Sequence, residues 1–412
     1  MAEDPRVKRA AELCARISKL TVALMEAEAD LTATESDVQL VLADPDQLER
    51  NQTPRTPAEK VGLFLELFGT RRSVFPQRWE NTKTGKSGYS PACDNEWHPG
   101  ICRKPQVKCA ECPHQKFPPL DERAIESHLR GERTLGVYAI GADDSCRFLA
   151  ADFDGEGWRE DVLAYQEASK RTGIGVAVER SRSDNGAHAW IFFSESVPAA
   201  AARKLGLILI AKASALRPTM GLAAYDRLFP NQDTLPTGGF GNLIALPLAK
   251  APRQRGNAVF VDDQFEPWAD QWAYLAGLRR LSRGMLEKTL ARIAPKPSLA
   301  TASLKTTDES PSDDFALAGD SLVLDLSRPR IRHGMVTGEI SLRLDAQVHV
   351  PRDLPSPVLA ALRRLATFPN PLFHEKLRLR FATFDTPRFL FAGEWHPDRL
   401  VLPRGALDEC VA

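Results

Sequence analysis

The hydrophobic positions near the start of the chain recur with the spacing of a helical seam. Alternating steps of three and four residues separate Ala10, Leu13, Ile17, Leu20, Leu24, Ala27 and Leu31. This heptad pattern predicts an amphipathic helix that packs along one stripe. We expect residues 1–56 to form a helical or coiled-coil segment that packs within the chain or pairs weakly with a second copy.

A second helix is predicted from Pro57 to Phe68. Proline is favoured in the first turn of a helix because its missing N–H has no intrahelical partner there. The apolar residues Val61, Phe64 and Phe68 lie on one face of this helix. The helix should therefore begin a globular domain, which we place at residues 57–294.

Beyond residue 134 the pattern changes to short apolar runs joined by helical periods. Strands are predicted over Leu135–Ile140, Cys146–Asp154, Gly175–Arg180, Ala187–Ser194 and Leu243–Leu248. Helices are predicted over Glu160–Arg171, Pro198–Leu216 and from Trp268 to Ile293. This arrangement predicts an α+β fold with one mixed core.

The region after this domain changes in composition. Residues 295–320 are rich in Ser, Thr, Pro and Asp and contain few apolar residues, which predicts a flexible linker. Strands near Leu322–Leu326 and Glu339–Leu344, followed by a helix over Pro355–Ala366, predict a small C-terminal α+β domain at residues 321–412.

Charge and hydropathy restrict the partners of the protein. The chain has 54 basic and 54 acidic residues, so any surface that binds nucleic acid must be local. It contains no apolar run long enough to span a membrane and begins with no signal peptide. We therefore expect a cytoplasmic protein without a membrane partner.

Four of the seven cysteines lie within twenty residues, at Cys93, Cys102, Cys109 and Cys112. In a reducing compartment such a cluster indicates metal binding rather than disulfides. Four thiolates complete a tetrahedral Zn²⁺ site, which predicts a structural zinc module over residues 89–115. His98 and His114 are alternative ligands if one cysteine does not bind.

The segment Phe148–Gly155 begins as an apolar run and ends in two carboxylates, Asp152 and Asp154. On a strand these side chains share a face while Phe153 points to the core. Like charges held so close favour a divalent cation between them, Mg²⁺ or Mn²⁺. Alone, the Asp-x-Asp pattern also occurs in sugar-nucleotide transferases and dehalogenase-type phosphatases. The phosphatase interpretation lacks a convincing catalytic Lys and second acidic pair.

A polar turn, Ser181–His188, follows the next predicted strand. Its hydroxyl, amide and unhindered backbone N–H groups suit phosphate oxygens. The candidate nucleotide-binding residues are Ser183, Asn185, Gly186, His188, Arg180 and Arg182. Further along, Asp226 ends a short apolar stretch, as a third metal-binding carboxylate would.

These motifs together resemble those of the archaeo-eukaryotic primase superfamily, in particular its primase-polymerase branch from prokaryotic TOTE conflict systems. CRISPR-associated primase-polymerases are related. The resemblance spans roughly Phe64 to Leu281 and includes Gly88–Cys93, Asn95–Trp97, Cys109–His114, Glu179–Ser183 and Phe229–Gln232. It implies a catalytic core made of an RRM-like half and an α/β half, with a zinc-binding insertion.

The resemblance implies a DNA-dependent primase-polymerase that adds nucleotides to a 3′-hydroxyl and acts in conflict or defence. In this reading Asp152, Asp154 and Asp226 hold two divalent ions about 3.5–4 Å apart. The partners are single-stranded DNA template, primer and nucleoside triphosphates. The alternative is a zinc-stabilised single-strand-binding module with a degenerate acidic site.

Two features depart from the family pattern. Asp184 stands where relatives usually carry glycine, which adds a negative charge beside the expected triphosphate. No Walker-type Gly-x-x-x-x-Gly-Lys motif is present, although Leu402–Gly405 resembles the segment that precedes a superfamily-2 helicase. A helicase partner in cis or in trans is therefore expected, and the chain is either a piece of such a fusion or a version without it.

Overall fold

The computed structural model of the chain describes residues 53–217, 219–221, 224, 226–293, 334–336, 339–383 and 385–411. The predicted N-terminal seam, the linker at 295–320 and the strand at 322–326 lie outside these residues. Among the described helices, none combines the length and apolar character needed to cross a membrane.

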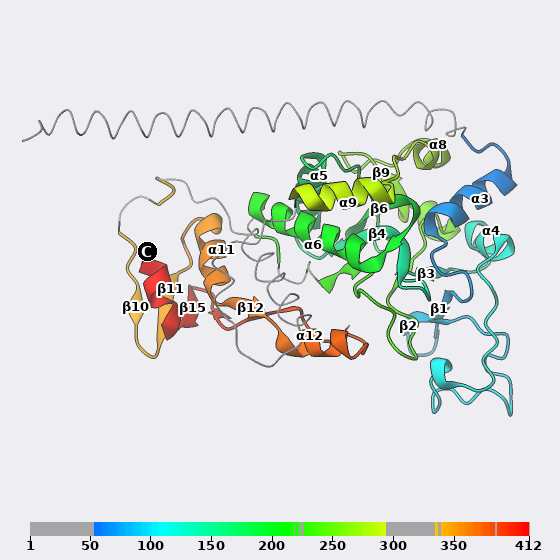
Figure 1. The fold of residues 1–412 in the computed structure, drawn as a ribbon, viewed down its shortest axis with the longest axis horizontal. Coiled ribbons are helices and arrows are strands. Elements are labelled where there is room, and N and C mark those ends of the chain that lie inside the picture. Colours follow the sequence, from blue (N-terminus) through cyan, green and yellow to red (C-terminus); the bar gives the residue numbers. More distant parts are fainter. Residues whose placement is uncertain are drawn as a thin grey trace, which may run out of the picture. The chain divides into compact units, whose positions relative to one another are not determined.

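A five-stranded antiparallel sheet forms the centre of the protein (Figure 1). Its strand order is β7 (Leu228–Phe229), β4 (Ser145–Asp154), β6 (Gly186–Pro198), β5 (Ala177–Arg180) and β9 (Val259–Val261). The two long strands β4 and β6 pair along most of their length. Three of these strands, β4, β5 and β6, were predicted, and the short strands β7 and β9 were not.

Three helices cover one face of this sheet. They are α5 (Trp158–Lys170), α6 (Ala199–Leu216) and α9 (Arg283–Ile293), and Figure 1 shows them lying over β4 and β6. The side chain of Phe153 points to this face, where its ring centroid lies 5.4 Å from that of Tyr165 on α5. The apolar residues of α6 are buried around most of its circumference, because the helix lies between the sheet and its two neighbours.

The opposite face of the sheet packs against α3 (Pro57–Phe68), whose bounds agree with the sequence prediction. Thr56 and Glu59 form a capping box at its first turn. The ring centroid of Phe68 lies 6.4 Å from that of Phe148, 5.1 Å from that of Trp190 and 5.3 Å from that of Phe192. This aromatic cluster supports the strand ends that carry the candidate site.

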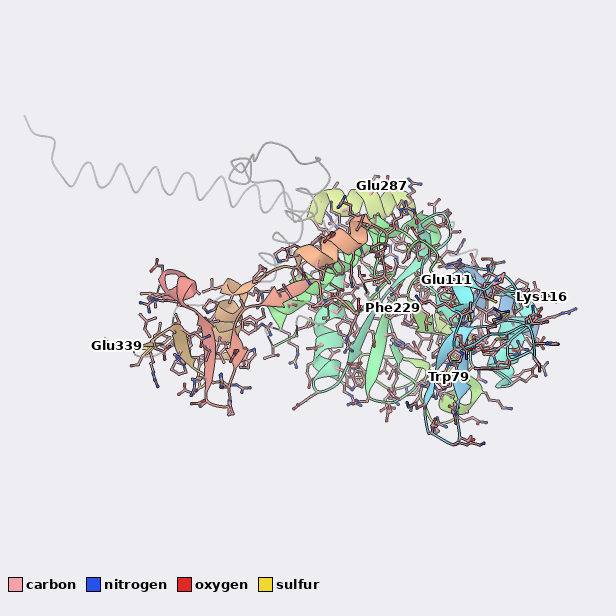
Figure 2. The ribbon with its side chains drawn as sticks, turned by 90° about the horizontal axis from the view of Figure 1, so that it is seen from below. Trp79, Glu111, Lys116, Phe229, Glu287 and Glu339 are labelled. Atoms are coloured by element: carbon pink, nitrogen blue, oxygen red, sulfur yellow. The ribbon has the colours of Figure 1, made fainter. Side chains whose placement is uncertain are left out.

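Up to Ile293, the described chain contains further elements before, between and after the strands of the central sheet. They are the hairpin β1 (Pro76–Glu80) and β2 (Ser87–Pro91), the turn η1 (Cys109–Glu111), α4 (Glu122–Arg130), the pair β3 (Gly136–Tyr138) and β8 (Leu243–Ala245), α7 (Lys250–Arg253) and α8 (Gln271–Ala276). Figure 2 marks Trp79 in the hairpin and Glu111 and Lys116 in the cysteine-rich segment.

One predicted helix is wrong in its extent. The helix expected from Trp268 to Ile293 is two helices, α8 and α9, with an irregular segment between them. Gly277 ends α8, and its N–H bonds to the carbonyl of Ala273. Leu281 then bridges to Phe193 at the sheet, so the chain must leave the helix to make this pairing.

The C-terminal residues form a four-stranded antiparallel sheet, several helices and a separate strand pair. The sheet order is β10 (Arg343–Leu344), β11 (Gln347–Pro351), β15 (Arg399–Pro403) and β14 (Glu394–Trp395). The other elements are α11 (Ser356–Leu365), β12 (Thr367–Pro369), α12 (Pro371–Arg378), β13 (Phe389–Phe391), η4 (Arg404–Ala406) and α13 (Leu407–Val411). Residues of β11, β15 and their neighbours bury a small core of their own.

Candidate active site

The two predicted carboxylates lie at the end of β4. Asp152 is paired in register with His188 on β6, and Asp154 is paired with Gly186. Phe153 between them is 4% exposed and belongs to the core. The prediction that the two acids share a face is therefore confirmed.

Asp226 lies next to this pair because β7 is the other neighbour of β4. The backbone N–H of Asp152 donates to the carbonyl of Arg227 at 3.0 Å. The guanidinium of Arg227 forms an ion pair with the carboxylate of Asp154. Asp226 accepts a hydrogen bond from the backbone N–H of Arg388 at 2.9 Å. Asp226 therefore lies just before the strand next to β4, but in the described part of the chain its carboxylate is not gathered into one group with Asp152 and Asp154.

Glu179 is a site residue that the sequence analysis did not select. It lies on β5 opposite His188 and is 2% exposed. One oxygen of its carboxylate lies 2.8 Å from Nδ1 of His188 and accepts from Nε1 of Trp190 at 3.1 Å. The signal that could have revealed it is an acid that follows the apolar residues Ala177 and Val178 in a buried strand.

The three strands β5, β6 and β4 therefore carry a continuous polar row. Nε2 of His188 lies 3.7 Å from Oδ1 of Asp152, on the side of the ring away from Glu179. Burial opposes the positive form of His188, but the charge and hydrogen bond of Glu179 and the charge of Asp152 outweigh it and raise its pKa. His188 thus lies between the buried Glu179 and Asp152, a candidate metal ligand.

Burial also acts on the first carboxylate. It raises the pKa of Asp152, the charge of His188 lowers it, and the nearby charge of Asp154 raises it further. Asp152 and Asp154 therefore lie close enough to repel each other. A positive charge placed between them would remove this repulsion.

The turn between β5 and β6 presents several of the predicted phosphate-binding groups. The N–H of Ser181 donates to the carbonyl of Gly186 at 2.9 Å, and the hydroxyls of Ser181 and Ser183 lie 3.1 Å apart. Ser183, Asp184 and Asn185 are exposed. Asp184 adopts a φ of 64°, a backbone conformation that favours glycine.

The two arginines of this turn differ in their surroundings. Arg180 donates to the backbone carbonyls of Gly256 and Phe265, and its Nε lies 3.7 Å from Oδ1 of Asp184. It therefore ties the turn to the following loop. Arg182 is half-buried and acts electrostatically on Tyr89 of β2, whose pKa is raised first by burial. Arg182 is thus the better placed of the two to meet a phosphate.

The carboxylates have the donor chemistry for Mg²⁺ or Mn²⁺, which both prefer oxygen ligands. Their mutual repulsion is consistent with that chemistry. In the part of the chain that the structure describes, however, no group of three His, Cys, Asp or Glu side chains is gathered as a metal site. Asp154 instead contacts Arg227, and Asp226 contacts the backbone of Arg388.

The four cysteines of the predicted zinc module line one small cavity. All four are free thiols and partly exposed. The backbone N–H of Lys116 donates to Sγ of Cys93 at 3.4 Å. Their chemistry suits Zn²⁺, although the described side chains here, as at the carboxylates, are not drawn together into a metal-binding group.

Comparison with known proteins identifies one family. The model of the archaeo-eukaryotic primase domain of TOTE conflict systems matches residues 59–289. No curated protein matches the chain. Among solved structures, the polymerase domain of Mycobacterium tuberculosis Ligase D in complex with DNA is similar, with 16% identity over 57% of this chain and 89% of that chain and a TM-score of 0.29. The family match includes the carboxylates, the polar turn and the cysteines.

Proposed function

Because the chain belongs to the archaeo-eukaryotic primase domain family of TOTE conflict systems, we propose that it is a template-dependent nucleotidyltransferase, a DNA primase-polymerase. The observation that carries this proposal is the polar edge of the central sheet. There Asp152 and Asp154 lie beside a histidine that is fixed by a buried glutamate, and Asp226 lies just before the neighbouring strand β7.

Asp152, Asp154 and Asp226 would hold the divalent ions. Such ions make a 3′-hydroxyl more acidic and stabilise the charge of departing pyrophosphate. The contribution of the protein is to fix Asp152 and Asp154 on a paired strand, so that these carboxylates need little further ordering when substrates bind. Arg227, which contacts Asp154, would move aside or turn to a phosphate oxygen when the carboxylate binds an ion.

The polar turn would bind the triphosphate. His188 presents Nε2 towards the edge, and its raised pKa favours the positive form that attracts phosphate. Ser183, Asn185 and the backbone of Gly186 would add hydrogen bonds, and Arg182 would add charge. Arg180 would act through the turn, since its guanidinium already donates to two backbone carbonyls.

Cys93, Cys102, Cys109 and Cys112 would hold a structural Zn²⁺. Closure of four thiolates around one ion fixes a loop that has little regular structure beyond the turn η1. The loop follows directly on the β1–β2 hairpin. A stable loop would in turn support the hairpin that carries Tyr89.

A template-directed extension assay with labelled nucleotides, run with and without primer, tests this function. Asp152→Ala, Asp154→Ala and Asp226→Ala should each abolish incorporation in Mg²⁺ or Mn²⁺ while the melting temperature stays close to that of the wild type. An Asp263→Ala variant, which removes an acid outside the site, should keep its activity. Normal incorporation by any of the three site variants would contradict the assignment of that carboxylate.

The second candidate function is a single-strand-binding module without catalysis. The ion pair between Asp154 and Arg227 favours it, because a carboxylate neutralised by an arginine needs no metal ion. The same assay separates the two functions. A binding module would retain single-stranded DNA but incorporate no nucleotide under any metal condition.

A further inference from the structure

The short segment Leu379–Phe381, which we call the 379–381 turn, follows α12 and contacts the catalytic part of the protein. The carbonyl of Phe381 accepts from Nε2 of Gln232 at 2.7 Å, and the carbonyl of Arg380 accepts from the N–H of Thr237 at 3.1 Å. Gln232 is 4% exposed, so its amide is a fixed donor. The backbone of the turn is therefore held from two sides.

The same region reaches the third carboxylate. The N–H of Arg388, seven residues after Phe381, donates to Asp226 at 2.9 Å. Phe389 is 6% exposed and joins the main hydrophobic core. The 379–381 turn is thus anchored to the segment that follows Asp226, and the chain leads from it directly to the edge where we place the chemistry.

The side chains of this turn are exposed although its backbone is fixed. Phe381 is 56% exposed and Leu379 is 43% exposed, while Leu372 on α12 is 52% exposed. An aromatic ring that a fixed backbone holds exposed to solvent is a typical surface on which a nucleic-acid base stacks. Arg380 has a backbone φ of 56°, a strained conformation for a residue other than glycine.

Two exposed arginines, Arg378 and Arg380, precede Phe381 in the sequence. Arg380 forms an ion pair with Asp144, in which Nη2 lies 3.6 Å from Oδ2. The acids nearby are Glu375, which is exposed, and Asp385, which pairs with Lys376 at 2.9 Å. An exposed aromatic ring with arginines beside it is complementary to a single nucleic-acid strand.

We propose that the 379–381 turn binds the single-stranded template, with a base stacked on Phe381 and a phosphate next to Arg380. This inference rests on the proposed function, since it assigns the partner of the surface beside that active site. The turn lies outside residues 59–289, so the family match does not assign it a role. The exposed ring of Phe381, which follows Arg378 and Arg380 in the sequence, favours a nucleic-acid strand over a protein partner for this surface.

The test measures binding of a fluorescent single-stranded oligothymidine to the full chain, without nucleotides and without added Mg²⁺ or Mn²⁺. Phe381→Ala and Phe381→Leu should weaken binding by roughly fivefold or more, because both remove the stacking ring. Phe381→Trp should retain the affinity. Trp395→Ala is the matched control, since Trp395 is 42% exposed on β14 of the separate C-terminal sheet, and it should bind like the wild type.

The charge component is tested by titrating salt. Arg380→Ala should reduce the slope of log affinity against log salt by about 0.7, the value for one phosphate contact to a single strand. Unchanged affinity in both Phe381→Ala and Phe381→Leu, at unchanged melting temperature, would overturn the proposal. A variant that changes the association state of the protein, but not its DNA affinity, would overturn it in favour of a protein interface.

Failure of the proposed function gives a different result. Binding is measured in the absence of nucleotide and of added Mg²⁺ or Mn²⁺, so loss of incorporation by Asp152→Ala leaves it unchanged. A wild-type chain that binds DNA through Phe381 but incorporates no nucleotide would disprove the catalytic proposal alone.

Discussion

Glu179 shows how a buried charge can position a neighbouring residue of the candidate site. A carboxylate that is 2% exposed needs partners, and it finds them in His188 and Trp190. Since both partners lie on the neighbouring strand, the imidazole is held at a fixed angle with Nε2 towards Asp152. We therefore regard Glu179 as a positioning residue.

Glu179→Gln should lower the nucleotide affinity of the enzyme while leaving its template affinity unchanged. The amide oxygen can still accept from His188 and Trp190, but the amide is neutral, so the negative charge that favours the protonated form of His188 is lost. We expect the apparent KM for nucleotide to rise several-fold. Steady-state kinetics and DNA binding on the same preparation check this, and a variant that changes only the melting temperature would show a purely structural role.

His188→Ala should mainly raise the nucleotide requirement, because it removes the group that we assign to the triphosphate. Initiation without primer should be affected more than extension, since it must bind a further nucleotide that no duplex positions. Template affinity should barely change. If His188 serves only packing beside Trp190, with ring centroids 6.0 Å apart, thermal stability and both activities would fall together.

His128 allows a prediction about pH and stability. It is 0% exposed, Nδ1 accepts from the N–H of Leu135 at 3.1 Å, and Nε2 lies 2.8 Å from the carbonyl of Pro247. Burial lowers its pKa from 6.5 to about 4. The pKa of His128 is lower in the folded than in the unfolded protein, so the neutral side chain contributes to the free energy of unfolding. This contribution is fully present above pH 6.5 and is lost as the pH falls towards 4.

The free energy of unfolding should fall by about 3 kcal/mol as His128 becomes protonated, since one pKa unit corresponds to 1.36 kcal/mol. Denaturant unfolding between pH 7 and 4.5 measures it. The variant His128→Gln, which cannot titrate, should be less stable at pH 7 and should lose less stability on acidification. Equal pH dependence in both proteins would contradict this account.

At the scale of elements, the sequence predicted the long strands and helices well because their hydrophobic periods are strong. Helix α3 agrees in both bounds, and β4 differs from its prediction by one residue at its start. The break between α8 and α9 was missed because Leu281 leaves the helix for a contact with a distant strand. Such a contact leaves no mark in the local pattern.

The candidate site was predictable to the same extent. Asp152 and Asp154 follow from the alternation of one strand, and the turn from its polar composition. Glu179 and the contact between Asp226 and Arg388 were not, since both depend on which strands and segments become neighbours. A single sequence encodes this pairing only through the whole fold.

The cysteine-rich element carries its own prediction, which is one Zn²⁺ per chain. Four thiolates bind this ion tightly and couple its binding to local folding. Elemental analysis of the purified protein should give one equivalent, and Cys109→Ser should reduce it. Cys410→Ser is the control, because Cys410 lies in α13, away from the cavity that the four cysteines line. Substoichiometric zinc that Cys109→Ser does not change would refute the site.

At the scale of the whole molecule, the C-terminal segment contributes to the part that the family model matches. Phe389 lies on β13, a hundred residues beyond the end of that match, yet it is 6% exposed within the main core. Thr237 and Gln232 bond to the turn before it. The part that the family model matches and this segment should therefore unfold together.

Phe389→Ala tests this integration. Truncation of a buried phenylalanine typically costs about 3–5 kcal/mol, and here the loss should appear in the unfolding of the catalytic part. Phe368→Ala is the matched control, because Phe368 lies on the paired strand β12 and is 45% exposed, so its loss should be small. Tryptophan fluorescence follows the transition through the buried Trp190. If Phe389→Ala leaves this transition unchanged, the C-terminal segment is not part of the folded catalytic unit, and its contact with Asp226 does not stabilise the site.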